Sequence, residues 1–211
     1  MSFSHPSAPA RPTPLAPALT PLLCPACGGA LDPLPDDVLF LCPGCGGASE
    51  LAAGSPRSRE VRFLASPSGE VASIYLPLWS FEENWITPAF NGSRLLTLTK
   101  WYSQRRAACT APGEASVRPL WGGRIGAQDA WRVCLLAHDA KPAHGADPDR
   151  DLQTGGSAPP GPRTPPTLLG VPYRTAPSHL VCALTGLHIY RETLEGAADL
   201  LARWDRWSAG V

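Results

Sequence analysis

Four cysteines near the N-terminus have the residue type and the spacing needed to bind a metal ion. They form two pairs of the same form, Cys-Pro-x-Cys-Gly-Gly, at residues 24–29 and 42–47, and 14 residues separate Cys27 from Cys42. A repeated C-x-x-C of this kind is typical of a tetrahedral site in which four thiolates bind one ion, most often structural zinc. The pattern therefore predicts a four-thiolate metal site.

Two thiolates two residues apart can bind one ion only if the chain turns tightly between them. Pro25 and Pro43 follow the first cysteine of each pair and fix φ near −65° there. Gly28 and Gly46 follow the second cysteine and can adopt a positive φ without steric cost. We expect this turn to direct backbone N–H groups at the sulfur atoms, which offsets part of the thiolate charge.

The segment between the pairs has the composition of a β-hairpin. We expect a short strand beginning near Ala30, a turn rich in Pro and Asp at 32–37, and a second strand over Val38–Cys42. Two cysteine turns on a hairpin resemble the zinc-ribbon family, and the resemblance covers residues 22–51. It implies that Cys24, Cys27, Cys42 and Cys45 are the ligands of one structural Zn²⁺. A closed site of this kind has no open position for catalysis, and its expected role is folding.

Three other interpretations of these cysteines remain open. They could be ordinary core or surface cysteines, or they could form two disulfides. We expect no secretory signal, because residues 1–21 lack a basic segment followed by an apolar run, and paired cysteines in an intracellular protein favour metal over disulfides. A rubredoxin-like iron site is the third alternative, because rubredoxins also use paired turns of this type.

The composition fits a partly folded chain with no bulk charge. The 211 residues are 44% hydrophobic, include 25 prolines and 20 glycines, and carry a formal net charge of zero. This length allows the ribbon and one further domain of roughly 100 to 130 residues. No apolar stretch approaches the roughly 18 residues of a membrane span. We expect a cytoplasmic location, and the excess of Arg, Ala, Pro and Gly suggests a bacterial genome rich in G and C.

Beyond the ribbon, the sequence predicts a small α+β domain with long irregular segments. Residues 1–21 are typical of a disordered Pro/Ala-rich tail, and 52–58 of a linker. The domain is expected over 59–138 and 168–209, with a low-complexity loop over 139–167 between its two parts. The expected elements are strands at 61–64 and 70–81, helices at 94–107 and 126–138, a hairpin of strands 179–184 and 187–190, and a helix at 192–207.

Two residues refine these predictions. Pro77 lies inside the second strand and suggests an edge position or a bulge, since proline cannot donate to a sheet ladder. Ser93 precedes the first helix and is the expected N-cap. The second helix should bury one stripe of side chains, formed by Ala127, Ala130, Trp131, Cys134, Leu135 and His138.

The remaining candidates for chemistry are weak. Cys134 and His138 are spaced i, i+4 on an expected helix, and Cys182 and His188 lie on neighbouring expected strands, so the four could form a second metal site. Burial is the better interpretation, because free cysteine behaves as a small hydrophobic residue. No hydrolase, dinucleotide or phosphate-loop motif is present, and the sequence predicts no enzyme.

The charge distribution bears on possible partners. No Lys or Arg occurs between Pro12 and Pro56, where four carboxylates and a Zn(Cys)₄ charge of −2 sum to −6. Such a module would repel a phosphate backbone. Residues 94–132 carry seven basic and two acidic residues, a net charge of +5. A possible basic partner patch consists of Arg94, Lys100, Arg105 and Arg106.

These features predict a zinc-binding, non-enzymatic protein that docks on another protein. Two alternatives remain: binding of nucleic acid through the basic 94–132 region, and electron transfer by a rubredoxin-like iron site.

Overall fold

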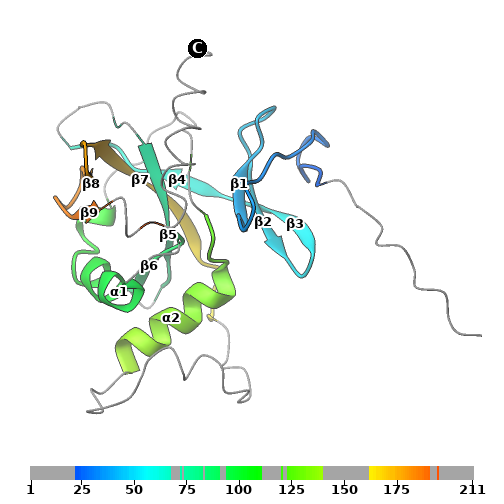
Figure 1. The fold of residues 1–211 in the computed structure, drawn as a ribbon. Helices are drawn as coiled ribbons and strands as arrows, with labels where there is room; N and C mark the ends of the chain where they lie inside the picture. Colours follow the sequence, from blue (N-terminus) through cyan, green and yellow to red (C-terminus); the bar gives the residue numbers. More distant parts are fainter. Residues whose placement is uncertain are drawn as a thin grey trace, which may run out of the picture.

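The computed structural model describes residues 22–67, 72, 74–82, 84–90, 94–110, 120, 123–139, 162–190 and 194. Within these residues the chain has a mixed α+β fold, with a three-stranded sheet, a six-stranded sheet and two α-helices (Figure 1). The three-stranded sheet lies beside the larger sheet, on the right in Figure 1. Neither helix is long and apolar enough to cross a membrane.

The three-stranded sheet is a meander in the order β1–β2–β3. Strand β1 (Leu39–Leu41) pairs antiparallel with β2 (Ala48–Ala52), which pairs antiparallel with β3 (Ser55–Arg59). Residues Ala53 and Gly54 between β2 and β3 both have positive φ, 50° and 78°, as in the tight turns that suit hairpins. The linker predicted over 52–58 is therefore wrong. This polar, proline-containing segment becomes a strand because β2 offers it a complete pairing partner.

The hairpin predicted for the ribbon is only partly confirmed. Its second strand is present as β1, but β1 pairs with β2, which follows the second cysteine turn. The predicted first strand contributes an isolated bridge between Leu23 and Ala30. The pairing thus encloses one cysteine turn and brings the other against it.

The six-stranded sheet has the order β6–β5–β7–β8–β9, and β4 pairs in parallel with β7. Its strands are β4 (Val61–Phe63), β5 (Ile74–Ser80), β6 (Ile86–Pro88), β7 (Thr167–Thr175), β8 (His179–Cys182) and β9 (His188–Tyr190), of which β6 and β7 were not predicted from the sequence.

Strand β7 is the centre of this sheet, and sequence reasoning missed it. It pairs with β5 along one side and with β4 and β8 along the other. Gly170 and Pro172 interrupt its apolar run and disguise the strand. Gly170 is required by packing, because a Cβ there would lie 2.5 Å from the Phe63 ring.

Pro77 lies in an interior strand and not at an edge, contrary to expectation, since β5 runs between β6 and β7. Its carbonyl accepts a hydrogen bond from the Ala89 N–H at 2.9 Å, so its missing N–H faces the same neighbour. The Ala89 carbonyl accepts instead from the N–H groups of Arg124 and Ile125, both at 2.8 Å. The proline therefore leaves room for a backbone segment that arrives from elsewhere in the chain.

Both helices expected between the strands are confirmed. Helix α1 (Leu95–Gln104) follows Arg94, whose φ is 70°, and α2 (Ala127–Asp139) begins one residue after the expected start. Ser93, the expected N-cap, lies outside the described residues. The stripe predicted on α2 is buried at Ala127, Ala130, Trp131 and Cys134 but exposed at His138.

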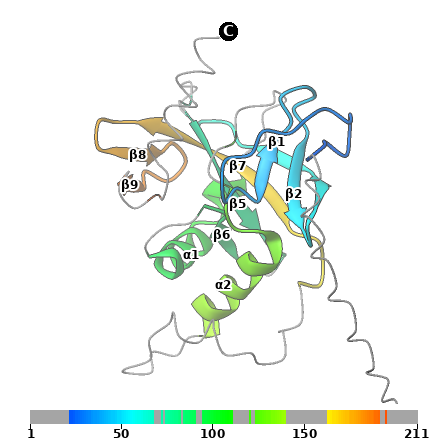
Figure 2. The same ribbon diagram turned by 45° about the vertical axis from the view of Figure 1, so that its right-hand side comes forward.

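The buried side chains among the described residues form two main hydrophobic cores. The first core contains Leu76, Leu78, Val171 and Tyr173 of the large sheet together with Tyr102 of α1. The second core packs α2 against the other side of β5, and it consists of Leu39, Trp79, Phe81, Ala89, Ala127, Ala130, Trp131, Cys134 and Leu168. Figure 2 shows α1 and α2 side by side below the sheet. Leu39 is the buried contribution of the three-stranded sheet to the second core.

Several predicted segments fall outside the described residues. The tail predicted over 1–21 lies entirely outside them, as does most of the loop predicted over 139–167. Of the helix predicted over 192–207, Leu194 alone is described, and it is buried. At the two ends of that loop, Asp139 closes α2 and Thr167 opens β7.

Candidate metal centre

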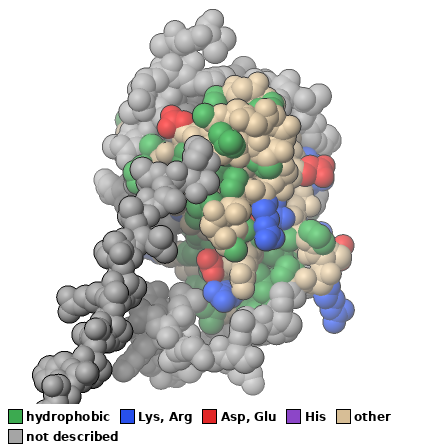
Figure 3. All heavy atoms as spheres, turned by 90° about the vertical axis from the view of Figure 1, so that its right-hand side faces the viewer, with side chains coloured by type: hydrophobic (Ala, Val, Ile, Leu, Met, Phe, Trp, Pro, Cys, Tyr) green, Lys and Arg blue, Asp and Glu red, His purple; other side chains and the backbone are tan. Residues whose placement is uncertain are grey.

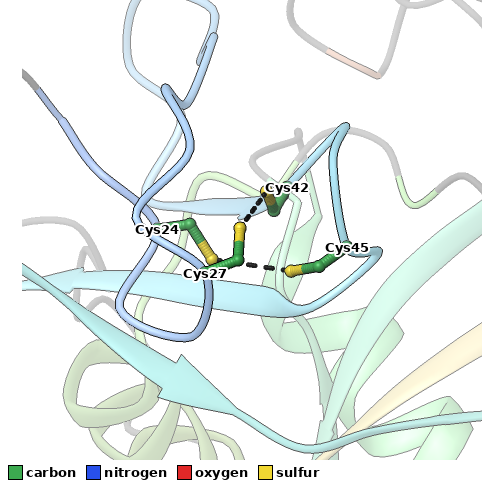
Figure 4. A group of neighbouring side chains, drawn as sticks. All are labelled: Cys24, Cys27, Cys42 and Cys45. Carbon is green, nitrogen blue, oxygen red and sulfur yellow. Dashed lines mark hydrogen bonds between the residues drawn. The ribbon is translucent and has the colours of Figure 1, made fainter.

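The four cysteine sulfurs form one compact cluster (Figure 4). All four Sγ atoms lie within 4.8 Å of one another, and two of the distances between the turns are 3.7 Å, from Cys24 to Cys45, and 3.6 Å, from Cys27 to Cys42. A tetrahedral ion with metal–sulfur bonds of about 2.3 Å places its sulfurs about 3.8 Å apart. The cluster therefore has the donor set and the dimensions of a Cys₄ metal site.

The two cysteine turns have the same backbone. In each, the first cysteine donates its N–H to the carbonyl five residues on, and the glycine at the fifth position donates back to the cysteine carbonyl. All four of these hydrogen bonds are 2.8 Å long. Gly28 and Gly46 have φ of 72° and 70°, the left-handed conformation that the sequence predicted for them.

Backbone N–H groups point at the sulfurs, as expected. N–H groups of Cys45 and Gly44 lower the pKa of Cys42 to about 7, although its burial opposes this. The Gly29 N–H also lowers the pKa of Cys27, but the neighbouring thiols of Cys42 and Cys45 together raise that pKa to about 12. Four crowded sulfurs cannot all ionise alone, so a bound cation is what would let all four become thiolates.

The cluster lies at the surface of a small apolar unit. Cys24 and Cys42 are buried with Leu31 and Phe40, whereas Cys27 and Cys45 are exposed. A core of this size is too small to hold the two turns together by itself. The ion that the sulfurs fit would therefore supply much of the stability of this unit.

A third turn has the same backbone without the second cysteine. Cys182 donates to the Leu187 carbonyl at 2.8 Å, Gly186 donates to the Cys182 carbonyl at 2.9 Å, and Gly186 has a φ of 69°. Thr185 stands where the second thiolate would be. The turn between β8 and β9 is thus a cysteine turn with one thiol, packed into the first core.

The second metal site considered from the sequence is not assembled. Cys134 lies in the second core and Cys182 in the first. The His138 ring stacks on Trp85 with centroids 4.8 Å apart, and the His188 ring stacks on His179 at 4.6 Å. Among the described residues, the four N-terminal cysteines alone form a group of three or more potential metal ligands from His, Cys, Asp and Glu.

The basic residues around α1 are spread around the helix. Arg94, Lys100 and Arg105 are exposed, and Arg106 is half-buried. Lys100 and Arg105 are five residues apart, which turns them about 140° from one another on a helix. Arg105 stacks on Trp101, with its Cζ atom 4.2 Å from the ring centroid.

Two of the four carboxylates counted in the ribbon are internal, whereas Asp32 and Asp36 are exposed. Asp37 and Glu50 are buried; Asp37 accepts the Leu34 N–H at 2.9 Å, and Glu50 pairs with Arg59 of β3 at 2.5 Å. Strand β3 also brings the exposed Arg57 into the same sheet. On the face shown in Figure 3, basic and acidic side chains are scattered among apolar ones and form no patch of one sign.

Site and fold together describe a mixed α+β protein with a candidate Cys₄ metal centre. The chain matches no protein-family model, no curated protein and no solved structure. Its function is therefore argued from the site.

Proposed function

We propose that this chain is a zinc-binding, non-enzymatic protein in which one Zn²⁺ at Cys24, Cys27, Cys42 and Cys45 has a structural role. The sulfur geometry carries the proposal, since four thiol groups converge within 4.8 Å and fit a tetrahedral ion. Zinc is favoured over other divalent ions because an all-thiolate tetrahedral set suits it. Four protein ligands leave no open position for substrate or water, which supports a structural role.

Metal content measured by elemental mass spectrometry tests this assignment. Protein expressed without added metal should contain one zinc per chain, and Cys42→Ser should lose it. Cys182→Ala is the matched control, because Cys182 occupies the same position in a turn that lacks a second cysteine; this variant should keep its zinc. A chain without metal, or a Cys42→Ser variant that retains zinc, contradicts the proposal.

Iron is the alternative occupant that the same donor set allows. A four-thiolate iron site would give the purified protein a red colour and visible absorption, and the role would then be electron transfer. The exposure of Cys27 and Cys45 favours this alternative, because it brings the site close to the surface. The elemental measurement separates the two metals directly.

The proposed role is docking on another protein. A pull-down from native lysate, compared between the intact chain and Cys42→Ser, tests whether a partner depends on the metal unit. Nucleic acid is the second candidate partner, and three exposed basic residues around α1 favour it: Arg94, Lys100 and Arg105. Binding to generic RNA or DNA that weakens steeply with salt would support it, and no binding at low salt would remove it.

A further inference from the structure

Glu50 joins the three-stranded sheet to helix α2. It lies in β2, it is 4% exposed, and its Oε1 accepts a hydrogen bond from the Ala127 N–H at 2.7 Å. Its Oε2 accepts from the Nε of Arg59 at 2.6 Å. Ala127 is the first residue of α2, where N–H groups have no partner within the helix and a negative charge is favoured. Glu50 thus caps a helix that begins 77 positions further along the chain.

The backbone provides a second attachment beside the first. The N–H groups of Val38 and Leu39 both donate to the Gly123 carbonyl, at 2.7 and 2.8 Å. The Leu39 side chain packs in the second core with Trp79 and Ala127. One edge of the small sheet therefore holds the chain that leads into α2.

Both attachments depend on the strands that the cysteines flank. Leu41 ends β1 directly before Cys42, and β2 begins three residues after Cys45. The second cysteine turn therefore connects the strand that carries Leu39 to the strand that carries Glu50. The apolar residues beneath the sulfurs are few, so an ion at the four cysteines would be the main constraint on this turn.

We propose that metal occupancy of the four cysteines controls the docking of the three-stranded sheet on the N-terminal end of α2. The inference rests on the proposed function, because it requires that an ion binds. When the ion leaves, β1 and β2 loosen, Glu50 withdraws from Ala127, and Leu39 leaves the second core. Trp79 and the first turn of α2 then become accessible. The first core keeps the large sheet folded, since it contains no residue of the three-stranded sheet.

Amide hydrogen exchange of the full chain, zinc-loaded and after treatment with a chelator, tests this coupling. Removal of zinc should raise exchange at least tenfold at residues 127–130 and leave the amides of β5 and β7 protected. Unchanged exchange at 127–130 after verified loss of zinc would overturn the coupling while leaving the zinc assignment intact. A starting sample without metal would instead refute the proposed function.

Linkage gives a reciprocal test, because two coupled equilibria must affect each other equally. Glu50→Gln should weaken zinc affinity about tenfold, since hydrogen bonds to a charged group are strong and a factor of ten corresponds to roughly 1.4 kcal/mol. Asp129→Asn is the matched control, because Asp129 is also an acid of the first turn of α2 but is exposed and bound to Arg132. It should bind zinc as the unmodified chain does.

Arg59→Lys provides a milder change at the same contact if Glu50→Gln fails to fold. It keeps the charge but loses the two-nitrogen contact with Glu50, and it should weaken zinc affinity by a smaller factor. Competition with a chromogenic chelator measures all three variants. Equal zinc affinity in the unmodified chain, the Asp129 control and the variants at Glu50 or Arg59 would overturn the proposal.

Discussion

Gly123 and Leu39 approach so closely that no side chain fits between them. A Cβ on Gly123 would lie 2.3 Å from the Leu39 Cβ and 2.8 Å from its carbonyl oxygen. The carbonyl oxygen of Gly123 accepts two hydrogen bonds, from the N–H groups of Val38 and Leu39. The approach of β1 to the segment that precedes α2 therefore requires a glycine at this point.

Gly123→Ala should destabilise the protein by about 1–3 kcal/mol, because backbone atoms would have to move apart. Urea unfolding followed by tryptophan fluorescence measures the change. Gly44→Ala is the control, since a Cβ there would meet the Cys42 Sγ at an ordinary 3.7 Å. Equal stability of the two variants would show that the contact yields without cost.

The buried hydroxyls of Tyr102 and Tyr173 hydrogen-bond to one another in the first core. Tyr102→Phe or Tyr173→Phe should each cost about 1–3 kcal/mol, because each leaves the other hydroxyl buried without its partner. The double variant should cost less than the sum of the two, as expected for a contacting pair. Chemical denaturation of the four proteins completes this cycle. Additive costs would mean that the hydroxyls do not depend on one another.

Alkaline pH should destabilise the fold through the first core. Burial, together with nearby Cys182, raises the pKa of Cys109 from 9.0 to about 12. Burial also raises the pKa values of Tyr102 and Tyr173 well above 10.0. Because the folded state favours the neutral groups, their contribution to stability is complete below about pH 9 and is lost as the pH rises towards 12.

The free energy of unfolding, measured from pH 8 to 12, should therefore fall across this window. Cys109→Ala removes one of the three groups and should make the fall less steep. A flat profile between pH 9 and 12 would contradict the burial of these groups.

The cysteine turns and the third turn allow a paired test of the positive-φ glycines. Gly28 and Gly186 have φ of 72° and 69°, and a Cβ at either position would meet nothing within 4 Å. Alanine at either position should cost about 1 kcal/mol through backbone strain alone. Gly28→Ala should also weaken zinc binding, whereas Gly186→Ala should not. Thermal unfolding and chelator competition measure the two effects, and a loss of zinc affinity in Gly186→Ala would contradict the assignment of the metal to the N-terminal turns.

Local patterns in the sequence were sufficient for the features that depend on near neighbours. The cysteine turns, both helices and the β8–β9 hairpin each involve residues a few positions apart, so spacing and turn chemistry predict them directly. The four clustered cysteines were predicted as a group for the same reason, since each pair fits within one turn.

Tertiary structure alone decided the features that depend on distant partners. Strand β7 exists because β4, β5 and β8 pair with it, and β3 exists because β2 does, although their own compositions argue against strands. Pro77 is tolerated inside a sheet although it cannot donate an N–H to the Ala89 carbonyl, because the N–H groups of Arg124 and Ile125 donate to that carbonyl instead. Glu50, counted from the sequence only as part of the acidic charge between Pro12 and Pro56, is buried as the cap of α2. Hydrogen-bond partners so far apart in the chain leave no periodic signal, so only the folded structure identifies them.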